Sequence, residues 1–172
     1  MKRTKWVDRK FNLGIPEGWL PNVITRLSGI TIRLKDLTSN LSEEALSLQL
    51  NERWSIKEHI GHLVDLEDLH IGRVTDFVNR KQILRAADMS NKQTYSANHN
   101  EKPISKLINE FDFKRNFLVS TLKNLDDETQ YLNSMHPRLK VPMKLVDMAF
   151  FTAEHDEHHI TSINEILAVL KF

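Results

Sequence analysis

The chain contains no cysteine among its 172 residues. Disulfide bonds, thiolate metal ligands and a cysteine nucleophile are therefore excluded from its chemistry. Glycine and proline are scarce, with five residues of each, so helix breakers are few and a helical structure is favoured. Neither sign of charge dominates, because 24 lysines and arginines against 23 aspartates and glutamates leave a net charge of +1. This balance argues against a nucleic-acid partner and against an anionic membrane surface.

Long apolar runs are missing as well. No stretch approaches the roughly 20 residues of a transmembrane helix, and the basic residues at the start are not followed by the apolar segment of a signal peptide. We therefore expect a cytoplasmic protein. The sequence does contain 40% hydrophobic and 27% charged residues, which at this length fits one ordinary globular domain.

Four segments carry apolar side chains at helical spacing, which predicts four amphipathic helices. They begin near residues 21, 55, 103 and 142 and end near residues 37, 81–87, 125 and 170. The second has the sharpest start, because Ser55 and Glu58 form an S-x-x-E capping box. We expect an all-α four-helix bundle over residues 21–172. Residues 1–20 read as an irregular extension held to the bundle by Trp6, Phe11 and Trp19.

The segments between the helices show weaker patterns. Residues 42–45 favour a short helical turn, whereas residues 88–102 are polar and aperiodic and predict a loop. Residues 126–141 form a long connection that contains His136 and Pro137. Strand signals are weak throughout, because no run that alternates with a period of two residues and ends in a hairpin turn stands out.

Two histidines of the fourth segment, His155 and His159, lie four residues apart on its apolar face. At that spacing two helical side chains are about 5–6 Å apart at Cβ, and two imidazoles can bind one metal ion. A third histidine from another helix would complete the open, three-ligand site typical of catalytic divalent metals. The second segment offers His59 and His62, which share nearly the same face, and periodicity does not separate them.

The alternative interpretation of these histidines is structural. A single histidine on an apolar face is more often a hydrogen-bonded core residue than a ligand, but a pair at this spacing with a third on another inward face favours metal. His158 is turned about 100° from His159, which predicts a place at the surface or behind a ligand. The remaining histidines are His70, His99 and His136, for which we expect solvated or capping roles. The mouth of a cavity is an alternative place for His136.

Three sharper motifs do not fit the sequence. Asp156 follows His155 where the zincin motif H-E-x-x-H requires glutamate. A di-iron carboxylate site needs glutamates on two further helices, and the first segment has none on its apolar face. The G-x-S-x-G elbow of many serine hydrolases is also missing, although this does not exclude a serine triad of another kind.

Several charged residues accompany the histidines. Metal-bound imidazoles usually donate their second N–H to a carboxylate or carbonyl, and the candidate carboxylates are Asp65, Glu58, Glu154 and Asp156. Capping is the favoured role for Glu58, whereas Asp65 and Asp156 are also candidate general bases. Arg115 interrupts the apolar face of the third segment. It is either a contact to substrate or to a carboxylate inside the bundle, or a snorkelling side chain.

Residues 54–65, WSIKEHIGHLVD, fit the pattern W-S-x-x-E…G-H-L-x-D, and residues 154–160, EHDEHHI, fit H-D-x-H-H. Together with His136-Pro137, these segments resemble the DinB-like superfamily, particularly its YfiT-type branch, over roughly residues 20–170. The resemblance implies a four-helix bundle, often dimeric, with a divalent metal, commonly nickel or zinc, on three histidines. Its first ligand is the histidine of the G-H-L segment, so the implied ligands are His62, His155 and His159.

The functions of that family are diverse. Many members are described as metal-dependent hydrolases, and others transfer low-molecular-weight thiols such as bacillithiol, mycothiol or glutathione. We therefore expect a hydrolase that acts on a small molecule through a three-histidine site, with a thiol S-transferase as the alternative. A non-catalytic metal-binding module, and histidines that serve the structure without metal, are further alternatives. The resemblance also implies a homodimer, but the fold does not select the substrate.

Overall fold

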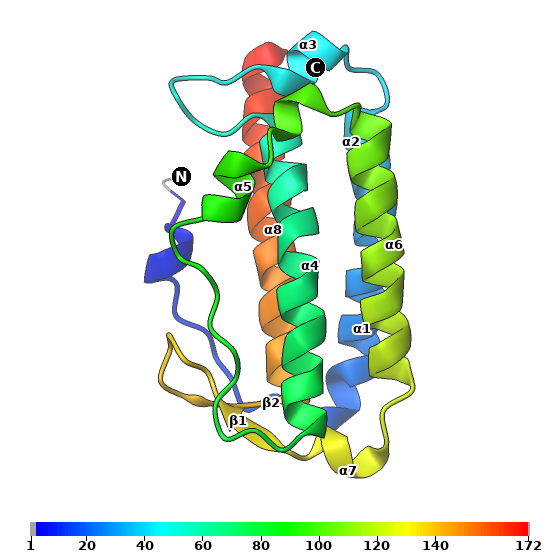
Figure 1. The fold of residues 1–172 in the computed structure, drawn as a ribbon, viewed down its shortest axis with the longest axis vertical. Helices are drawn as coiled ribbons and strands as arrows, with labels where there is room; N and C mark the ends of the chain where they lie inside the picture. The colour runs from blue at the N-terminus through cyan, green and yellow to red at the C-terminus, as the bar shows by residue number, and fades with distance from the viewer. Residues whose placement is uncertain (1–2, 172) are drawn as a thin grey trace.

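The computed structural model describes residues 3–171, in which long helices run side by side along the long axis (Figure 1). The helices are α1 (Leu20–Ser28), α2 (Ile30–Thr38), α3 (Glu43–Ser47), α4 (Ile56–Val78), α5 (Lys92–Ser96), α6 (Ile104–Lys123), α7 (Asp127–Gln130) and α8 (Leu145–Leu170). Short 3-10 turns cover Trp6–Asp8, Glu17–Trp19 and His99–Glu101, and two strands, β1 (Asn133–Met135) and β2 (Pro142–Lys144), form an antiparallel pair.

Four rods make up the bundle, one of them formed by α1 and α2 in succession. Helix α4 packs against α6 and α8, and α1 packs against the same two helices. The α1–α2 rod therefore lies diagonally across the bundle from α4. This arrangement confirms the predicted all-α four-helix bundle. Within residues 3–171, no helix combines the length and the apolar character needed to cross a bilayer.

Local sequence signals explain where α4 begins and where the α1–α2 rod is interrupted. Ser55 Oγ accepts a hydrogen bond from the Glu58 backbone N–H at 3.1 Å, and Glu58 Oε2 accepts one from the Ser55 backbone N–H at 2.7 Å. The predicted capping box is thus present at the start of α4. The first predicted helix is interrupted at Gly29, where the regular helical pattern ends and restarts at Ile30.

The buried apolar side chains form two clusters, one in each half of the bundle. One contains residues from α1, the second half of α4 and the first half of α8, and the other contains residues from α2, the first half of α4 and the second half of α8. A polar layer separates them, built from Glu67, Arg115 and Asp156, all at most 1% exposed. Arg115 Nη1 also lies 3.3 Å from the Leu27 carbonyl oxygen, close to the interruption at Gly29.

Several boundaries differ from the sequence prediction. Helix α4 ends at Val78 rather than fading over residues 81–87, and residues 88–102 contain α5 and a 3-10 turn rather than a plain loop. The weak strand signals left two short strands unpredicted, because β1 and β2 pair and Ile83 forms a further bridge to Met135. Since residues 142–144 belong to β2, α8 begins at Leu145 and not at Pro142.

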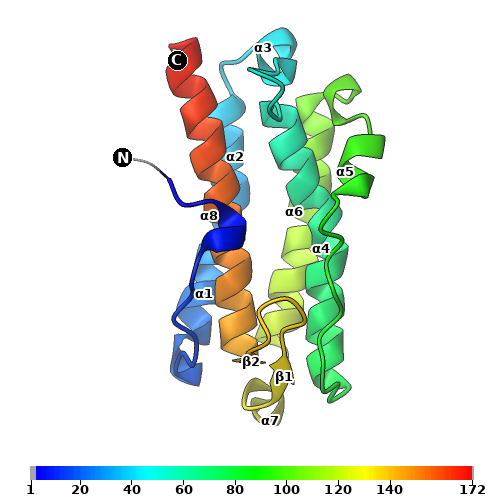
Figure 2. The same ribbon diagram turned by 90° about the vertical axis from the view of Figure 1, so that its left-hand side faces the viewer.

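The N-terminal segment, residues 3–19, lies along α8 (Figure 2). Its backbone N–H groups at Gly14 and Ile15 both donate to Asp147 Oδ1, at 2.8 and 2.9 Å. The Trp6 ring packs 4.9 Å from that of Phe151. Phe11 packs on Phe151 as well, at 5.0 Å. Trp19 does not contribute as expected, because it is 61% exposed.

Candidate metal centre

Three histidine side chains converge between α4 and α8. One ring nitrogen from each of His62, His155 and His159 lies within 4.8 Å of the other two. His155 and His159 stand one turn apart on α8 with their Nε2 atoms 3.2 Å apart, and His62 faces them from α4. All three side chains are buried. The structure therefore brings together the three residues that the resemblance implied as ligands.

These histidines are held in the neutral form that binds metals. Burial lowers the pKa of His62 to about 4 and holds the pKa values of His155 and His159 well below the ordinary value. The neighbouring imidazoles lower the pKa values of His155 and His159 further. At neutral pH each ring therefore carries one N–H and one lone pair, and the lone pair is what a metal ion requires.

A hydrogen-bonded chain behind His62 fixes which nitrogen carries the proton. The Thr94 hydroxyl donates to Asp65 Oδ2 at 2.8 Å and lies 3.0 Å from His62 Nδ1. Because a hydroxyl has a single proton to donate, Thr94 must accept the Nδ1–H of His62. Nε2 of His62 is then left with its lone pair. Burial favours the neutral acid of Asp65, but hydrogen bonds from His99 and Thr94 outweigh it and lower the pKa, so this carboxylate is charged.

His99 completes this chain from the other side. Its Nε2 donates to Asp65 Oδ2 at 2.9 Å, and its ring is 2% exposed. The ring lies directly over Gly61, where any Cβ would overlap it. The glycine that precedes His62 is therefore explained by the close approach of His99, which in turn holds the carboxylate behind His62.

The other two histidines are oriented differently. His159 Nδ1 lies 2.9 Å from Nδ1 of His59, so His59 is placed behind a candidate ligand. Nδ1 of His155 is buried and has no hydrogen-bond partner among residues 3–171. With both rings protonated on Nδ1, that of His159 donating to His59, the Nε2 atoms of His155 and His159 face each other as two lone pairs without a donor between them. A cation that accepts these lone pairs resolves the contact, so the donor set fits a divalent metal.

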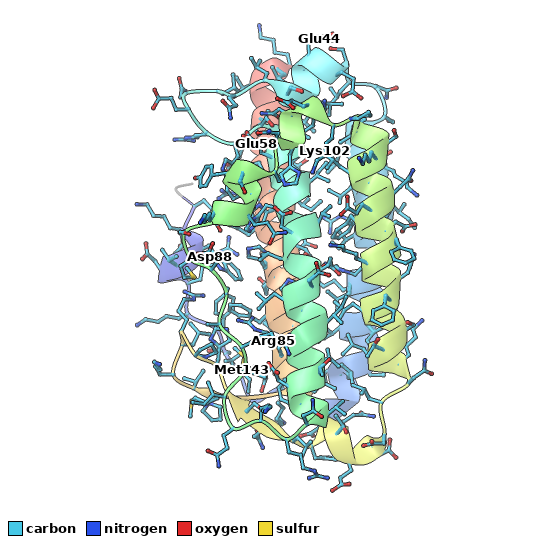
Figure 3. The ribbon with its side chains drawn as sticks, in the orientation of Figure 1. Glu44, Glu58, Arg85, Asp88, Lys102 and Met143 are labelled. Carbon is cyan, nitrogen blue, oxygen red and sulfur yellow. The ribbon has the colours of Figure 1, made fainter. Side chains whose placement is uncertain are left out.

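The centre opens onto a cavity of about 420 Å³. One wall is formed by α4 and α8, and the opposite side by the N-terminal segment at Trp6 and the stretch before α5 at Ala86–Asn91. Figure 3 labels Arg85 and Asp88 on the segment between α4 and α5, which contains this stretch and runs beside α4. Trp54 covers the centre, with its ring stacked 6.1 Å from that of His159. A volume of this size is typical of small-molecule sites.

The two candidate general bases do not lie in the cavity. Asp65 binds Thr94 and His99 as described, and Asp156 binds Arg115 Nη1 at 2.5 Å and Nη2 at 3.1 Å. Glu67 binds the same guanidinium from the other side at 2.6 Å. Burial raises the pKa of both Glu67 and Asp156, while their charges raise that of Arg115 against its own burial. Arg115 is thus a buried carboxylate contact rather than a snorkelling side chain, and Asp156 serves the bundle core.

The remaining histidines depart from expectation. His70, His99 and His136 are at most 3% exposed, so the predicted solvated roles are wrong. His70, His136 and Pro137 line the cavity, and His136 also has the expected capping role, because its Nδ1 accepts the backbone N–H groups of Arg138 and Leu139. His158 is half-buried at the cavity wall with Nδ1 at 3.4 Å from Arg9 Nη2.

Sequence reasoning missed Thr94 and Arg73. Thr94 lies in the aperiodic stretch, where no sequence signal pointed to it. Arg73 lies in the cavity wall on the inward face of α4, and a cation on an apolar helical face was a usable signal. Of the other carboxylates, Glu58 caps α4, as expected, and Glu154 pairs with Arg26 at 2.8 Å.

Comparison with known proteins places this arrangement in a family. The family model described as the DinB superfamily matches residues 29–163, which include all three histidines. The chain belongs to the DinB superfamily. A search of curated proteins gives no match.

Two solved structures have the same fold. The first is described as "YfiT from Bacillus subtilis is a probable metal-dependent hydrolase with an unusual four-helix bundle topology". It superposes with a TM-score of 0.83 at 17% identity, over 95% of this chain and 94% of the other. The second, the mycothiol-dependent maleylpyruvate isomerase, gives a TM-score of 0.66 at 10% identity, over 87% of this chain and 62% of the other. At these identities the likeness establishes the fold.

Proposed function

We propose that the protein binds one divalent metal ion, nickel or zinc, through His62, His155 and His159 and hydrolyses a small molecule. The observation that carries this proposal is the convergence of three neutral, buried imidazoles within 4.8 Å at the wall of an open cavity. A purely structural cluster would have no need of a cavity beside it. The description of YfiT as a probable metal-dependent hydrolase supports the same chemistry.

The residues around the centre would hold and orient the ligands. When bound, a divalent ion supplies a Lewis acid that lowers the pKa of a coordinated water or thiol. Asp65 and Thr94 fix the ring of His62, and the negative charge of Asp65 makes that imidazole a better donor. Asp65 therefore acts as a positioning residue rather than as the general base. The rings of Trp54 and Trp6 lie 6.1 and 4.9 Å from those of His159 and His155 and would limit the access of water to the centre.

The test of the proposal is a substrate screen on metal-loaded protein. Wild-type protein reconstituted with zinc or nickel is assayed against small esters and amides of organic acids, beside His159→Ala and the metal-free protein. We expect hydrolysis by the loaded wild type only. Turnover that survives in both His159→Ala and the metal-free protein would contradict a metal-dependent site.

A second candidate function is low-molecular-weight thiol transfer, favoured by the structural likeness to a mycothiol-dependent isomerase. The same loaded protein is assayed with bacillithiol, mycothiol or glutathione and chlorodinitrobenzene as electrophile. Metal-dependent thiol consumption without ester or amide hydrolysis would select this function. The homodimer is part of the proposal and is tested by sedimentation equilibrium, where a monomer mass would exclude it.

A further inference from the structure

The end of the cavity away from the metal centre is lined by three side chains that donate hydrogen bonds, and two of them have a buried nitrogen without a partner among residues 3–171. Arg73, His136 and Arg138 line it, the first from α4 and the other two from the loop between β1 and β2. Arg73 follows His62 by eleven residues on the same helix, a rise of about 16 Å along the axis. Leu66, Leu69 and His70 line the wall between them. The cavity is therefore elongated, with an apolar middle and a different polar chemistry at each end.

His136 presents an unsatisfied N–H to this end. Its Nδ1 accepts the backbone N–H groups of Arg138 and Leu139, at 3.3 and 3.1 Å. Burial, with Arg73 and Arg138 nearby, lowers the pKa of His136 to about 4, so the ring is neutral at pH 7. A neutral imidazole that accepts at Nδ1 carries its proton on Nε2. That Nε2 is buried and has no hydrogen-bond partner among residues 3–171.

Neither of the two arginines has a carboxylate in direct contact among the residues that the structure describes. Within residues 3–171 neither forms an ion pair, and Asp76, the carboxylate that acts on Arg73, binds Arg85 at 2.9 Å instead. Arg73 uses Nε on the Arg85 carbonyl oxygen at 3.2 Å, and Nη2 of Arg138 is buried without a partner. Burial lowers the pKa of Arg73 to about 10, with Arg138 and Arg85 adding to the effect and Asp76 opposing it. Both guanidinium groups remain charged at pH 7.

Buried donors and cations are normally satisfied, because an unpaired one costs free energy. Here three of them, from two separate elements, face one cavity. We propose that this end of the cavity binds a terminal oxyanion of the substrate, a carboxylate or phosphate at the far end of an apolar body. Guanidinium groups match the oxygens of either group. The inference rests on the proposed function, since it assigns the bond that reacts to the histidine end and the charge to the arginine end.

The direct test is binding of model anions to metal-free protein, followed by calorimetry. Phenylbutyrate and phenyl phosphate carry the anion on an apolar body, and phenylbutanol is the neutral counterpart of the first. We expect at least one anion to bind at least tenfold more tightly than phenylbutanol. We also expect Arg73→Gln and Arg138→Gln each to weaken the binding of that anion at least tenfold. The matched control is Arg80→Gln, which removes a surface arginine paired with Glu128 and should change nothing.

The outcomes separate this inference from the metal proposal. Arg138 is only partly buried, so Arg138→Gln keeps the test valid if Arg73→Gln fails to fold. His155→Ala should lose metal yet still bind the anion, and the arginine variants should keep wild-type metal content. Equal binding of the neutral and charged probes, or anion binding that needs zinc and ignores both arginine variants, would overturn the inference. Preference for one anion over the other decides between carboxylate and phosphate.

Discussion

Replacing Thr94 with valine removes one hydroxyl from the chain behind His62 and preserves the side-chain shape. That hydroxyl lies 3.0 Å from His62 Nδ1 and 2.8 Å from Asp65 Oδ2. Its loss leaves a buried N–H without an acceptor, at a cost of about 1–3 kcal/mol. It also frees the imidazole to adopt the other tautomer, which places the proton on the nitrogen that faces the metal.

We expect Thr94→Val to weaken zinc binding about 10–100-fold, as removal of such outer partners does in other metal sites. This corresponds to about 1.4–2.8 kcal/mol. The assay is competition for zinc against a chelating dye at fixed pH. Thr38→Val is the matched control, because Thr38 is a buried threonine whose hydroxyl binds the Leu34 carbonyl at 2.7 Å, away from the centre. Equal zinc affinity of Thr94→Val and wild type would refute the role given to the Asp65–Thr94–His62 chain.

Three further predictions follow from the buried polar groups. Gly61→Ala should weaken zinc binding, because the added Cβ overlaps the His99 ring. We expect this loss even though alanine favours a helix over glycine by about 1 kcal/mol. Unchanged zinc affinity in the same dye assay would contradict this prediction. Arg115→Met should lower the free energy of unfolding by about 3–5 kcal/mol, since it leaves two buried carboxyls without their cation; urea denaturation measures the loss, and a change below about 1 kcal/mol would argue against it. Burial lowers the pKa of His62 and His136 to about 4 from an ordinary 6.5, and it holds the pKa values of His155 and His159 well below 6.5, so the unfolded chain binds more protons than the folded chain over this range. The free energy of unfolding of the metal-free protein should therefore fall as the pH is lowered from 6.5 to about 4, and constant stability over that window would contradict the depressed pKa values of these histidines.

The parts of the fold that the sequence predicted are those with local causes. The capping box at Ser55 and the apolar stripe beyond it depend on residues a few positions apart, so the start of α4 was predictable. The i, i+4 spacing of His155 and His159 is equally local, and it placed both rings on one face. The assignment of His62 over His59 came from resemblance, because both residues lie on nearly the same face of α4.

The parts that were missed depend on contacts between distant residues. The strands β1 and β2 are three residues each, too short to show alternation, and they form because Met135 also bonds to the chain at Gln82 and Leu84. Helix α5 is five residues long and is held by the contact of Thr94 with α4. Such elements follow from the packing of the bundle and leave no periodic signal.

The polar layer shows a third case. The sequence indicated only that Arg115 broke an apolar stripe, and both a buried and a snorkelling side chain satisfied that observation. Glu67 and Asp156 come from two other helices, so the ion pairs became visible only when the helices were placed. This placement also removed Asp156 from the candidates for the general base.

The central claim is tested most directly by the metal content of the tag-free protein, measured by inductively coupled plasma mass spectrometry. Wild type is compared with His62→Ala and His155→Ala, and with His136→Ala as a buried histidine of the same cavity that lies outside the candidate ligand cluster. We predict about one equivalent of nickel or zinc in the wild type and in His136→Ala, with loss of metal in the other two. Full metal content in both His62→Ala and His155→Ala, or no metal in the wild type after reconstitution, would contradict the three-histidine centre.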